Sequence, residues 1–223
     1  MRQALGLLSI GILFLFSSSC VYSASCAPVV LVTGFEPFQN YTVNPSQMIA
    51  ELLNGSSLAG AEIVGVVLPV DFNESVMLAE QAMEQYHPVL VLSIGLAATS
   101  STIKVEKIGV NLKRYPKGDG TWSFPRRIEK NGPFLHRSPL PTKEIVDEMK
   151  KAQIPARQSI CAGTYVCNSL FYQLIGYVNE QNLTTKVGFI HVPLLDSQDP
   201  HGLPLQTMVN AVKITIQTSL LSL

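Results

Sequence analysis

The chain has 223 residues and a formal net charge of zero, and 47% of its residues are hydrophobic while 14% are charged. This composition is typical of a folded globular protein and excludes a disordered or fibrous one. Because the charge is balanced, the chain as a whole has no electrostatic attraction for nucleic acid or for an anionic membrane, and a charged partner would need a local patch. We therefore expect one compact core and no nucleic-acid partner.

The N-terminus has the three-part order of a secretory signal peptide. Arg2 is an early cation, residues 4–16 form an apolar run, and small residues follow up to residue 25. The apolar run is too short to span a bilayer well, so stable membrane insertion is not expected. We therefore predict that residues 1–25 are a signal peptide, that residues 26–223 form a single mature domain, and that the protein is secreted or periplasmic.

Two other interpretations of the N-terminus remain open, and we rank both below simple secretion. Cys20 follows three serines and is a candidate lipid-attachment cysteine, although Ser17 stands where such signals usually carry an aliphatic residue. An uncleaved membrane anchor is the other alternative. Four Asn-x-Ser/Thr sequons matter only in a eukaryotic secretory pathway, and they begin at Asn40, Asn54, Asn73 and Asn182.

Taken in chain order, apolar runs alternate with amphipathic stretches. Residues 29–32 are a continuous apolar run, as expected for a buried parallel strand. Asn44 as an N-cap, Pro45 at the first helical position and Gly55 as a terminator then predict a helix. Further strands are predicted at residues 61–70, 89–95 and 186–193, and further helices at 73–86, 142–152, 164–179 and 205–221. This alternation predicts an α/β fold, a three-layer sandwich with a mostly parallel twisted sheet and helices on both faces.

Two stretches depart from the alternation of strand and helix. Residues 103–111 alternate in hydropathy, which predicts an edge strand or a hairpin strand. Residues 113–141 mix Gly, Pro and aromatic residues with an excess of Lys and Arg, which predicts a long irregular insertion. Such an insertion is typical of a lid or a subunit contact, and a solvated basic loop is an equally good interpretation.

The expected mature chain has three cysteines: Cys26, Cys161 and Cys167. An oxidising compartment favours disulfides, but an odd number leaves at least one thiol free or paired outside the chain. The four histidines show no tight spacing with these cysteines, so a zinc site is not predicted. We expect no metal and no other cofactor.

Three side chains form a candidate catalytic set. Cys167 falls at the first turn of the helix predicted at 164–179, where the backbone N–H groups and the helix dipole favour a thiolate. His191 lies near the carboxyl end of an apolar strand, so its imidazole could pair with that thiolate and protonate a leaving amine. Glu106, an acid in an apolar stretch, could orient the imidazole. From these residues alone, an unreactive buried cysteine, a histidine bonded to the backbone and an exposed acid paired with a neighbouring lysine stay open.

Four separated segments together carry a resemblance to a known family. They are "VLVTGFEPF" followed by "VNPS", "GLAATSSTIKVEKIGVN", "SICAGTYVCN" and "GFIHVP". In this order, and over almost all of the mature chain, they resemble the pyroglutamyl peptidase I family of cysteine peptidases, also called pyrrolidone carboxylate peptidases. The resemblance implies an open α/β/α sandwich in which Cys167 is the nucleophile, His191 the base and acid, and Glu106 the orienting carboxylate.

The resemblance also implies the reaction and the substrate. Family members remove an N-terminal pyroglutamyl (5-oxoprolyl) residue from peptides through a thioester acyl-enzyme, without metal or cofactor, and often assemble into homodimers or homotetramers. Phe35 and Phe38 match family aromatics that line the lactam pocket, and Asn44 matches a polar position near it. From the sequence alone, core packing for the phenylalanines and helix capping for Asn44 remain alternatives.

The chain departs from the family pattern at several positions. Leu96 stands where many bacterial members have a glutamine near the lactam, and Gln39-Asn40 replaces the usual Gly-Gly. Cys161 occupies a position usually held by a small or hydroxyl residue, and we expect it to be a small packing residue beside Cys167. Two other functions therefore remain open: a secreted binding module of the same fold without turnover, and an amidase that acts on another small cyclic amide.

Overall fold

The computed structural model describes residues 27–222, and its main element is a seven-stranded sheet. The strands are β1 (Val29–Phe35), β2 (Ser57–Leu58), β3 (Ala61–Leu68), β4 (Leu90–Leu96), β5 (Ile103–Glu106), β8 (Ala156–Ser159) and β9 (Lys186–Val192). Their order across the sheet is β2-β3-β1-β4-β9-β5-β8. The pairs β3/β1, β1/β4, β4/β9 and β5/β8 are parallel, while β2/β3 and β5/β9 are antiparallel. The sheet is thus mostly parallel, as predicted.

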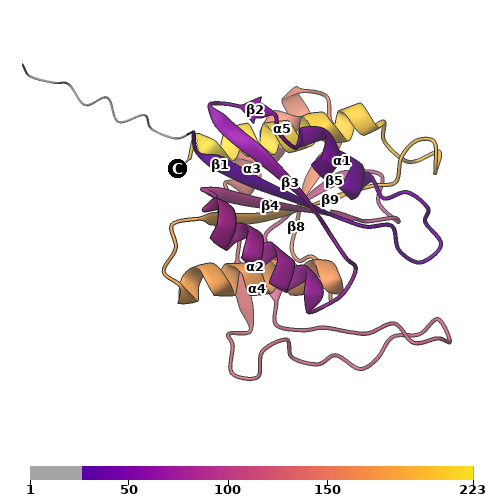
Figure 1. Ribbon diagram of the computed structural model, residues 1–223. Helices are drawn as coiled ribbons and strands as arrows, with labels where there is room; N and C mark the ends of the chain where they lie inside the picture. Colours follow the sequence, from indigo (N-terminus) through magenta and orange to yellow (C-terminus); the bar gives the residue numbers. More distant parts are fainter. Residues whose placement is uncertain (1–26, 223) are drawn as a thin grey trace, which may run out of the picture.

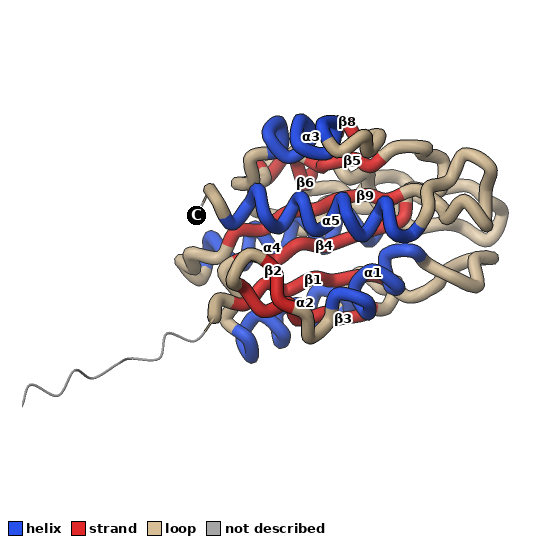
Figure 2. Tube along the Cα trace, turned by 90° about the horizontal axis from the view of Figure 1, so that it is seen from above, coloured by secondary structure: helices blue, strands red, loops and turns tan. Residues whose placement is uncertain are grey.

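Helices cover both faces of this sheet (Figure 1). One layer holds α1 (Pro45–Leu53), α3 (Thr142–Lys151) and α5 (Leu205–Leu220), which lie in front of the strands in Figure 2. The other layer holds α2 (Glu74–Tyr86) and α4 (Val166–Glu180). The predicted three-layer α/β sandwich is therefore confirmed. Among the described helices, none combines the length and the hydropathy that a membrane crossing requires.

The two helical layers enclose two apolar cores, one on each face of the sheet. Side chains such as Val32, Ile49, Ile190 and Ile216 fill the α1/α3/α5 side, and side chains such as Phe35, Phe171 and Phe189 fill the α2/α4 side. Every residue of β4 is buried. A strand that lies between two cores has no solvent-facing side, which is why β4 is a continuous apolar run rather than an alternating one.

Local signals in the sequence place α1 correctly. The Asn44 side chain accepts a hydrogen bond from the Ser46 N–H at 3.0 Å, and Pro45 occupies the first helical turn. The helix ends before Gly55, which adopts φ +73°, a left-handed conformation that glycine reaches without steric cost. Capping and termination are thus decided within about ten residues of chain, and they could be read from the sequence.

The prediction for residues 103–111 is wrong in part. β5 is not an edge strand, because it lies between β9 and β8. The following β6 (Ile108–Val110) leaves the main sheet and pairs with β7 (Leu135–Arg137) in a separate two-stranded sheet. Hydropathy alternation reports which face of a strand is buried, not which strands lie beside it, so neither the position of β5 nor the change of sheet was visible in the pattern.

The predicted insertion at residues 113–141 is irregular except for β7 and for two isolated antiparallel bridges. The short polar strand β8 was not predicted, because its residues "ARQS" carry no apolar run. The predicted signal peptide at residues 1–25, the lipid-attachment alternative at Cys20, and Cys26 all lie outside the described residues.

Candidate active site

Three strands and one helix meet at the carboxyl edge of the parallel strands. His191 is the next-to-last residue of β9, with Gly95 of β4 opposite it on one side and Lys104 of β5 on the other. Helix α4 begins at Val166, so Cys167 lies in its first turn. The parallel strands β4 and β9 end side by side at this edge, and β5, which runs antiparallel to β9, brings residues 104–106 alongside them, so residues far apart in sequence meet here.

Glu106 and His191 form a buried pair. The imidazole Nδ1 lies 2.8 Å from the Glu106 Oε1 atom. His191 is 8% exposed and Glu106 is 1% exposed. The other carboxylate oxygen, Oε2, is buried and has no hydrogen-bond partner among the described residues. The His191 ring also packs against Phe189, with ring centroids 4.9 Å apart. The imidazole is therefore held in one orientation by a carboxylate and by an aromatic ring.

The charge state of His191 depends on both of its acidic neighbours. Burial by itself lowers the pKa of the imidazole, but hydrogen bonds to Cys167 and to Glu106, together with their negative charges, outweigh burial and raise the pKa to about 9. With this pKa the ring is protonated at neutral pH, and its Nδ1–H donates to the Glu106 carboxylate. An imidazolium beside a cysteine is the arrangement that favours a thiolate.

Gly95 makes this convergence possible. A Cβ atom at this position would lie 2.8 Å from the Cys167 Sγ atom, 2.9 Å from the Phe189 Cζ atom and 3.1 Å from the His191 Cδ2 atom. These distances are shorter than normal carbon contacts, so the thiol, the imidazole and the aromatic ring converge over the space left by the missing side chain. The sequence pattern predicts for Gly95 only the end of a strand.

The first turn of α4 is fixed by its neighbour Asn168. The Asn168 side chain donates to the carbonyls of Val110 and Leu112 at 2.8 and 2.9 Å and accepts from the Val110 N–H at 2.9 Å, so its amide uses both faces to tie the helix to β6. The N-cap residue Tyr165 makes no side-chain cap bond. The first N–H groups of an α-helix have no acceptor within the helix. Those of α4 lie next to the Cys167 side chain, and the Tyr165 side chain accepts from none of them.

The structure corrects the expectation for Cys161. This residue is exposed, in a loop after β8, next to Ile160, which is 77% exposed. It is Ala162 that turns inward, with 7% of its surface exposed. Spacing alone did not show which residue of the loop faces the core. Cys161 and Cys167 are both free thiols in the described residues, so they form no disulfide with each other.

The three predicted substrate-binding residues lie between the last residue of β1 and the N-cap of α1, in different environments. Phe35 is 2% exposed and belongs to the same core cluster against which Cys167 packs. Phe38 is half-buried in the loop, with its ring 5.9 Å from that of Tyr41. Asn44 is 1% exposed; it accepts from Ser46 and donates to the Glu36 carbonyl at 3.0 Å. Most of the Asn44 hydrogen-bonding capacity therefore serves to hold the loop.

The loop that contains Phe38 carries one strained residue. Gln39 has φ 54°, a left-handed conformation that costs a non-glycine residue on the order of 1 kcal/mol. The glycine that the family usually has at this point would adopt it freely. Gln39 therefore adds conformational strain to this loop that a glycine would not add.

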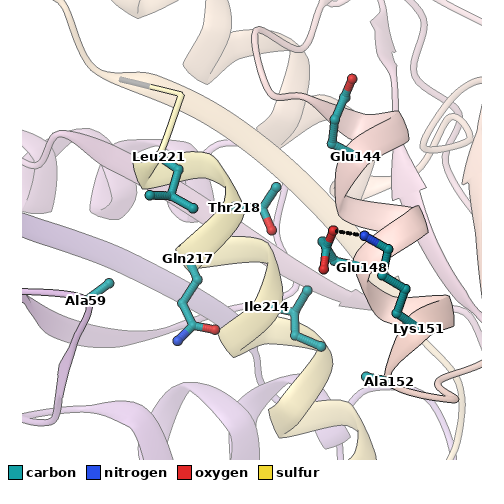
Figure 3. Close-up of a pocket in the computed structure, with 9 residues that line it drawn as sticks. All are labelled: Ala59, Glu144, Glu148, Lys151, Ala152, Ile214, Gln217, Thr218 and Leu221. Carbon is teal, nitrogen blue, oxygen red and sulfur yellow. Dashed lines mark hydrogen bonds and ion pairs between the residues drawn. The ribbon is translucent and has the colours of Figure 1, made fainter.

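Two cavities lie on the surface of the described residues, away from the Cys167 side chain. A groove of about 700 Å³ between α3 and α5 contains the ion pair Lys151–Glu148, at 2.6 Å (Figure 3), and it lies on the helical layer that does not contain Cys167. A smaller cavity of about 250 Å³ lies at the carboxyl edge, lined by the loops that follow β4 and β9. In residues 27–222 no group of His, Cys, Asp or Glu side chains is arranged to hold a metal ion.

Comparison with known proteins identifies the family of this chain. The model of the family described as "Pyroglutamyl peptidase" matches residues 29–221. The chain is 37% identical over 201 residues to pyrrolidone-carboxylate peptidase 1 of Ralstonia nicotianae, covering 86% of this chain and 93% of that one. It is 35% identical over 196 residues to the pyrrolidone-carboxylate peptidase of Bacillus velezensis, covering 85% of this chain and 91% of that one.

Solved structures are similar over the same length. The pyrrolidone carboxyl peptidase from Thermococcus litoralis superposes with a TM-score of 0.81 at 31% identity, covering 86% of this chain and 93% of that chain. Pyroglutamyl peptidase I of Bacillus amyloliquefaciens superposes with a TM-score of 0.80 at 35% identity, covering 86% and 96%. Family model, sequence identity and fold agree, and the chain belongs to the pyroglutamyl peptidase family of cysteine peptidases.

Proposed function

We propose that this chain removes N-terminal pyroglutamyl residues from peptides, with Cys167 as nucleophile, His191 as proton carrier and Glu106 as the group that orients His191. Membership of the family supports the activity. The observation that supports the three roles is the buried Glu106–His191 hydrogen bond of 2.8 Å. The His191 imidazole and the Cys167 thiol both lie beside Gly95, where no side chain separates them. Nucleophile, base and orienting acid in that order are what thiol catalysis requires.

The reaction follows from these positions. The Cys167 thiolate attacks the carbonyl carbon that joins pyroglutamate to the next residue, and the carbonyl oxygen takes the displaced electron pair. When the tetrahedral species collapses, the C–N bond breaks and the His191 imidazolium gives its proton to the leaving amine. A water molecule, deprotonated by the neutral His191, then hydrolyses the thioester. Free pyroglutamate leaves, and the thiolate and imidazolium are restored.

The start of α4 supplies the electrostatic part of this mechanism. Its first N–H groups, beside Cys167, have no acceptor within the helix and carry the positive end of the helix dipole. They are the donors proposed for the oxyanion that forms on the attacked carbonyl. Because Asn168 ties this turn to β6, the donors are positioned before the substrate arrives.

The proposed substrate has a neutral ring where most peptides have an ammonium group. A lactam is recognised by apolar walls with a few aimed hydrogen bonds. Phe38, half-buried in the loop after β1, is the proposed wall residue, while Phe35 and Asn44 support that loop from within. Leu96 is 8% exposed at the end of β4 and offers no side-chain hydrogen bond, so we propose that backbone groups supply the polar contacts to the lactam.

We expect kcat/KM for a pyroglutamyl substrate to fall as the pH rises through about 9, the pKa of His191. Above this pH the imidazole is neutral, so it neither balances the thiolate nor protonates the leaving amine. The raised pKa also means that the imidazolium stabilises the fold below the ordinary value of 6.5, and that this contribution is lost as the pH rises through about 9. A pH–rate profile measures this fall of kcat/KM, which is the alkaline limb of the profile.

The variant Glu106→Gln provides the control for this assignment. It removes one of the charges that raise the pKa of His191, so the alkaline limb should move to lower pH while kcat falls by on the order of a hundredfold or more. If kcat/KM of this variant falls at the same alkaline pH as that of the parent, the titration of His191 does not cause the fall.

The proposed function is tested by a fluorogenic pyroglutamyl amide under reducing conditions, with the corresponding prolyl amide as control. Proline differs from pyroglutamate by the ring carbonyl and by its charged amine, so the pair reports on lactam recognition alone. Release of fluorophore from the pyroglutamyl amide only is the expected result. Tight binding without release would instead indicate a binding module, and cleavage only of other cyclic amides would indicate a different amidase.

We also propose that the chain is secreted or periplasmic, on the basis of the cation, apolar run and small residues at its N-terminus. Mass spectrometry of protein recovered from the secretory fraction tests this proposal. A mature N-terminus at about residue 26 is expected, and an intact Met1 or a lipid on Cys20 would contradict it. Assembly into a homodimer or homotetramer stays a prediction, which light scattering of the purified protein checks.

A further inference from the structure

Residues 37–43, which we call the Phe38 loop, lie between β1 and α1 and have few attachments to the rest of the molecule. Most of these residues are exposed, and within the loop the Tyr41 N–H donates to the Phe38 carbonyl at 3.1 Å. Just before the loop the Glu36 N–H donates to the Leu68 carbonyl at 3.0 Å, and just after it Asn44 is buried. The two ends are therefore fixed, while the exposed residues between them need a further contact to hold one position.

One side chain from a distant part of the sequence supplies such a contact. The Gln198 Nε2 atom donates to the Val43 carbonyl at 3.0 Å. Gln198 lies in the loop that follows β9, 155 positions further along the chain. Within residues 27–222 no other hydrogen bond joins the Phe38 loop to another segment. The hydrogen bond that anchors the Phe38 loop therefore comes from the loop that continues the His191 strand.

Gln198 is itself held in place by the loop after β9. Its Oε1 atom accepts from the Leu195 N–H at 3.0 Å, and its own N–H donates to the Leu195 carbonyl at 2.9 Å. The same loop is closed by the Leu203 N–H, which donates to the Leu194 carbonyl at 2.9 Å. Because Oε1 is used by a backbone donor, the amide presents its NH₂ group to the Val43 carbonyl. One end of the amide thus bonds within its own loop, and the other bonds across to the Phe38 loop.

The loop after β9 continues directly from the strand of the proposed catalytic histidine. His191 is the next-to-last residue of β9, and residues 191–195 are all buried. A run of buried residues in a close-packed core has little freedom to move. Leu195, which orients the Gln198 amide, therefore lies on a rigid segment that begins at His191. Gln198 links the position of the Phe38 loop to that segment.

We propose that Gln198 is a positioning residue, which holds the Phe38 loop in place through Val43 and so sets the affinity of the site for the pyroglutamyl ring. The inference rests on the proposed function, in which Phe38 is a wall of the lactam pocket. Val43 is linked back to Phe38 through Tyr41, whose N–H and ring both contact Phe38. A wall of the pocket binds the lactam alike in the ground state and in the transition state, so the contribution of Gln198 should appear in KM rather than in kcat.

The test is Gln198→Glu, assayed with the fluorogenic pyroglutamyl amide. The glutamate keeps an acceptor for the Leu195 N–H, but it places an oxygen opposite the Val43 carbonyl where the parent has a donor. KM is expected to rise roughly fivefold, the size of one neutral hydrogen bond, while kcat stays within about twofold. Gln198→Ala, which removes both bonds of the amide, should raise KM at least as much.

Gln206→Glu is the matched control. Gln206 is exposed at the start of α5, and its Nε2 atom donates to the Asn210 Oδ1 atom at 3.0 Å. This variant therefore makes the same chemical change and adds the same charge without breaking a bond to the Phe38 loop. Its KM and kcat should match those of the parent.

The two Gln198 variants together separate the proposed role from other roles. If Gln198→Ala raises KM but Gln198→Glu does not, the amide only braces its own loop and the inference is wrong. A fall in kcat with KM unchanged would mean that Gln198 acts on His191, which also contradicts the inference. Parent-like kinetics in both variants would refute it while the proposed function stands. A parent that cleaves no pyroglutamyl amide overturns the proposed function itself.

Inhibition by the bare lactam gives an independent readout. The compound 2-pyrrolidone has the ring amide of pyroglutamate but no bond to be cleaved, so its inhibition constant reports on the ring pocket without the chemical step. In Gln198→Glu this constant should rise by the same factor as KM, and in Gln206→Glu it should not change. An inhibition constant that is the same in Gln198→Glu and in the parent would contradict the inference, because the amide would then not set the affinity for the ring.

Discussion

Replacing Cys167 with alanine is expected to lower kcat for a pyroglutamyl amide by at least about a thousandfold, because the variant has no atom that can form the thioester. Without the sulfur, the imidazolium of His191 also loses a hydrogen bond and a negative charge that raise its pKa. The side chain is half-buried and small, so the fold should survive the change. Stopped-flow or discontinuous assays on the purified variant measure the loss.

Cys161→Ala is the matched control, since it removes the other described thiol six residues earlier. Cys161 is exposed and lies outside the cluster of Cys167, His191 and Glu106, so this variant should keep its kcat within about twofold. The pair separates a loss of one particular thiol from a general effect of removing sulfur. Retention of activity in Cys167→Ala, or its loss in Cys161→Ala, would contradict the proposed nucleophile.

Gly95→Ala is expected to have the second-largest effect, although it adds a single methyl group. The new Cβ atom would lie within 3.1 Å of atoms of Cys167, Phe189 and His191. The buried Phe189 ring cannot leave its core cluster cheaply, so the thiol and the imidazole must move. Displacement of reacting groups by a few tenths of an ångström should lower kcat/KM on the order of a hundredfold, and overpacking should cost about 1–3 kcal/mol in unfolding free energy.

Gly176→Ala makes the same chemical change elsewhere. Gly176 lies in α4, and a Cβ atom there would come no closer than 3.5 Å to a neighbour, which is an ordinary contact. Since alanine favours helix over glycine by up to about 1 kcal/mol, this variant should be as active as the parent and equally or more stable. Denaturant unfolding and kcat/KM are measured for both glycine variants. If Gly95→Ala and Gly176→Ala behave alike, the close packing at Gly95 does not determine the activity of the site.

Much of the local structure was visible in the sequence. Asn44, Pro45 and Gly55 marked α1, and the apolar runs that became β1, β4 and β9 indicated a mostly parallel sheet with helices on both faces. Capping, termination and burial periodicity depend on residues within one or two turns of each other, so they leave a readable pattern. The same patterns placed Cys167 at a helix start and His191 near a strand end, and family motifs selected Glu106.

Other features depend on which strands lie side by side, and no local pattern records that. The position of β5 between β9 and β8 brings Glu106 to His191, whereas its alternation alone suited an edge strand equally well. Cys161 was expected to pack inward, yet the loop after β8 turns Ala162 inward instead.

By itself the sequence determined the class of fold, the family and the chemical types in the site, because these follow from local periodicity and from motifs. The tertiary structure alone decided that Gly95 leaves room for the thiol and the imidazole, and that the loop after β9 brings Gln198 to Val43. Such contacts join residues dozens of positions apart, and their energy depends on distances of a few ångströms that only the packed chain defines.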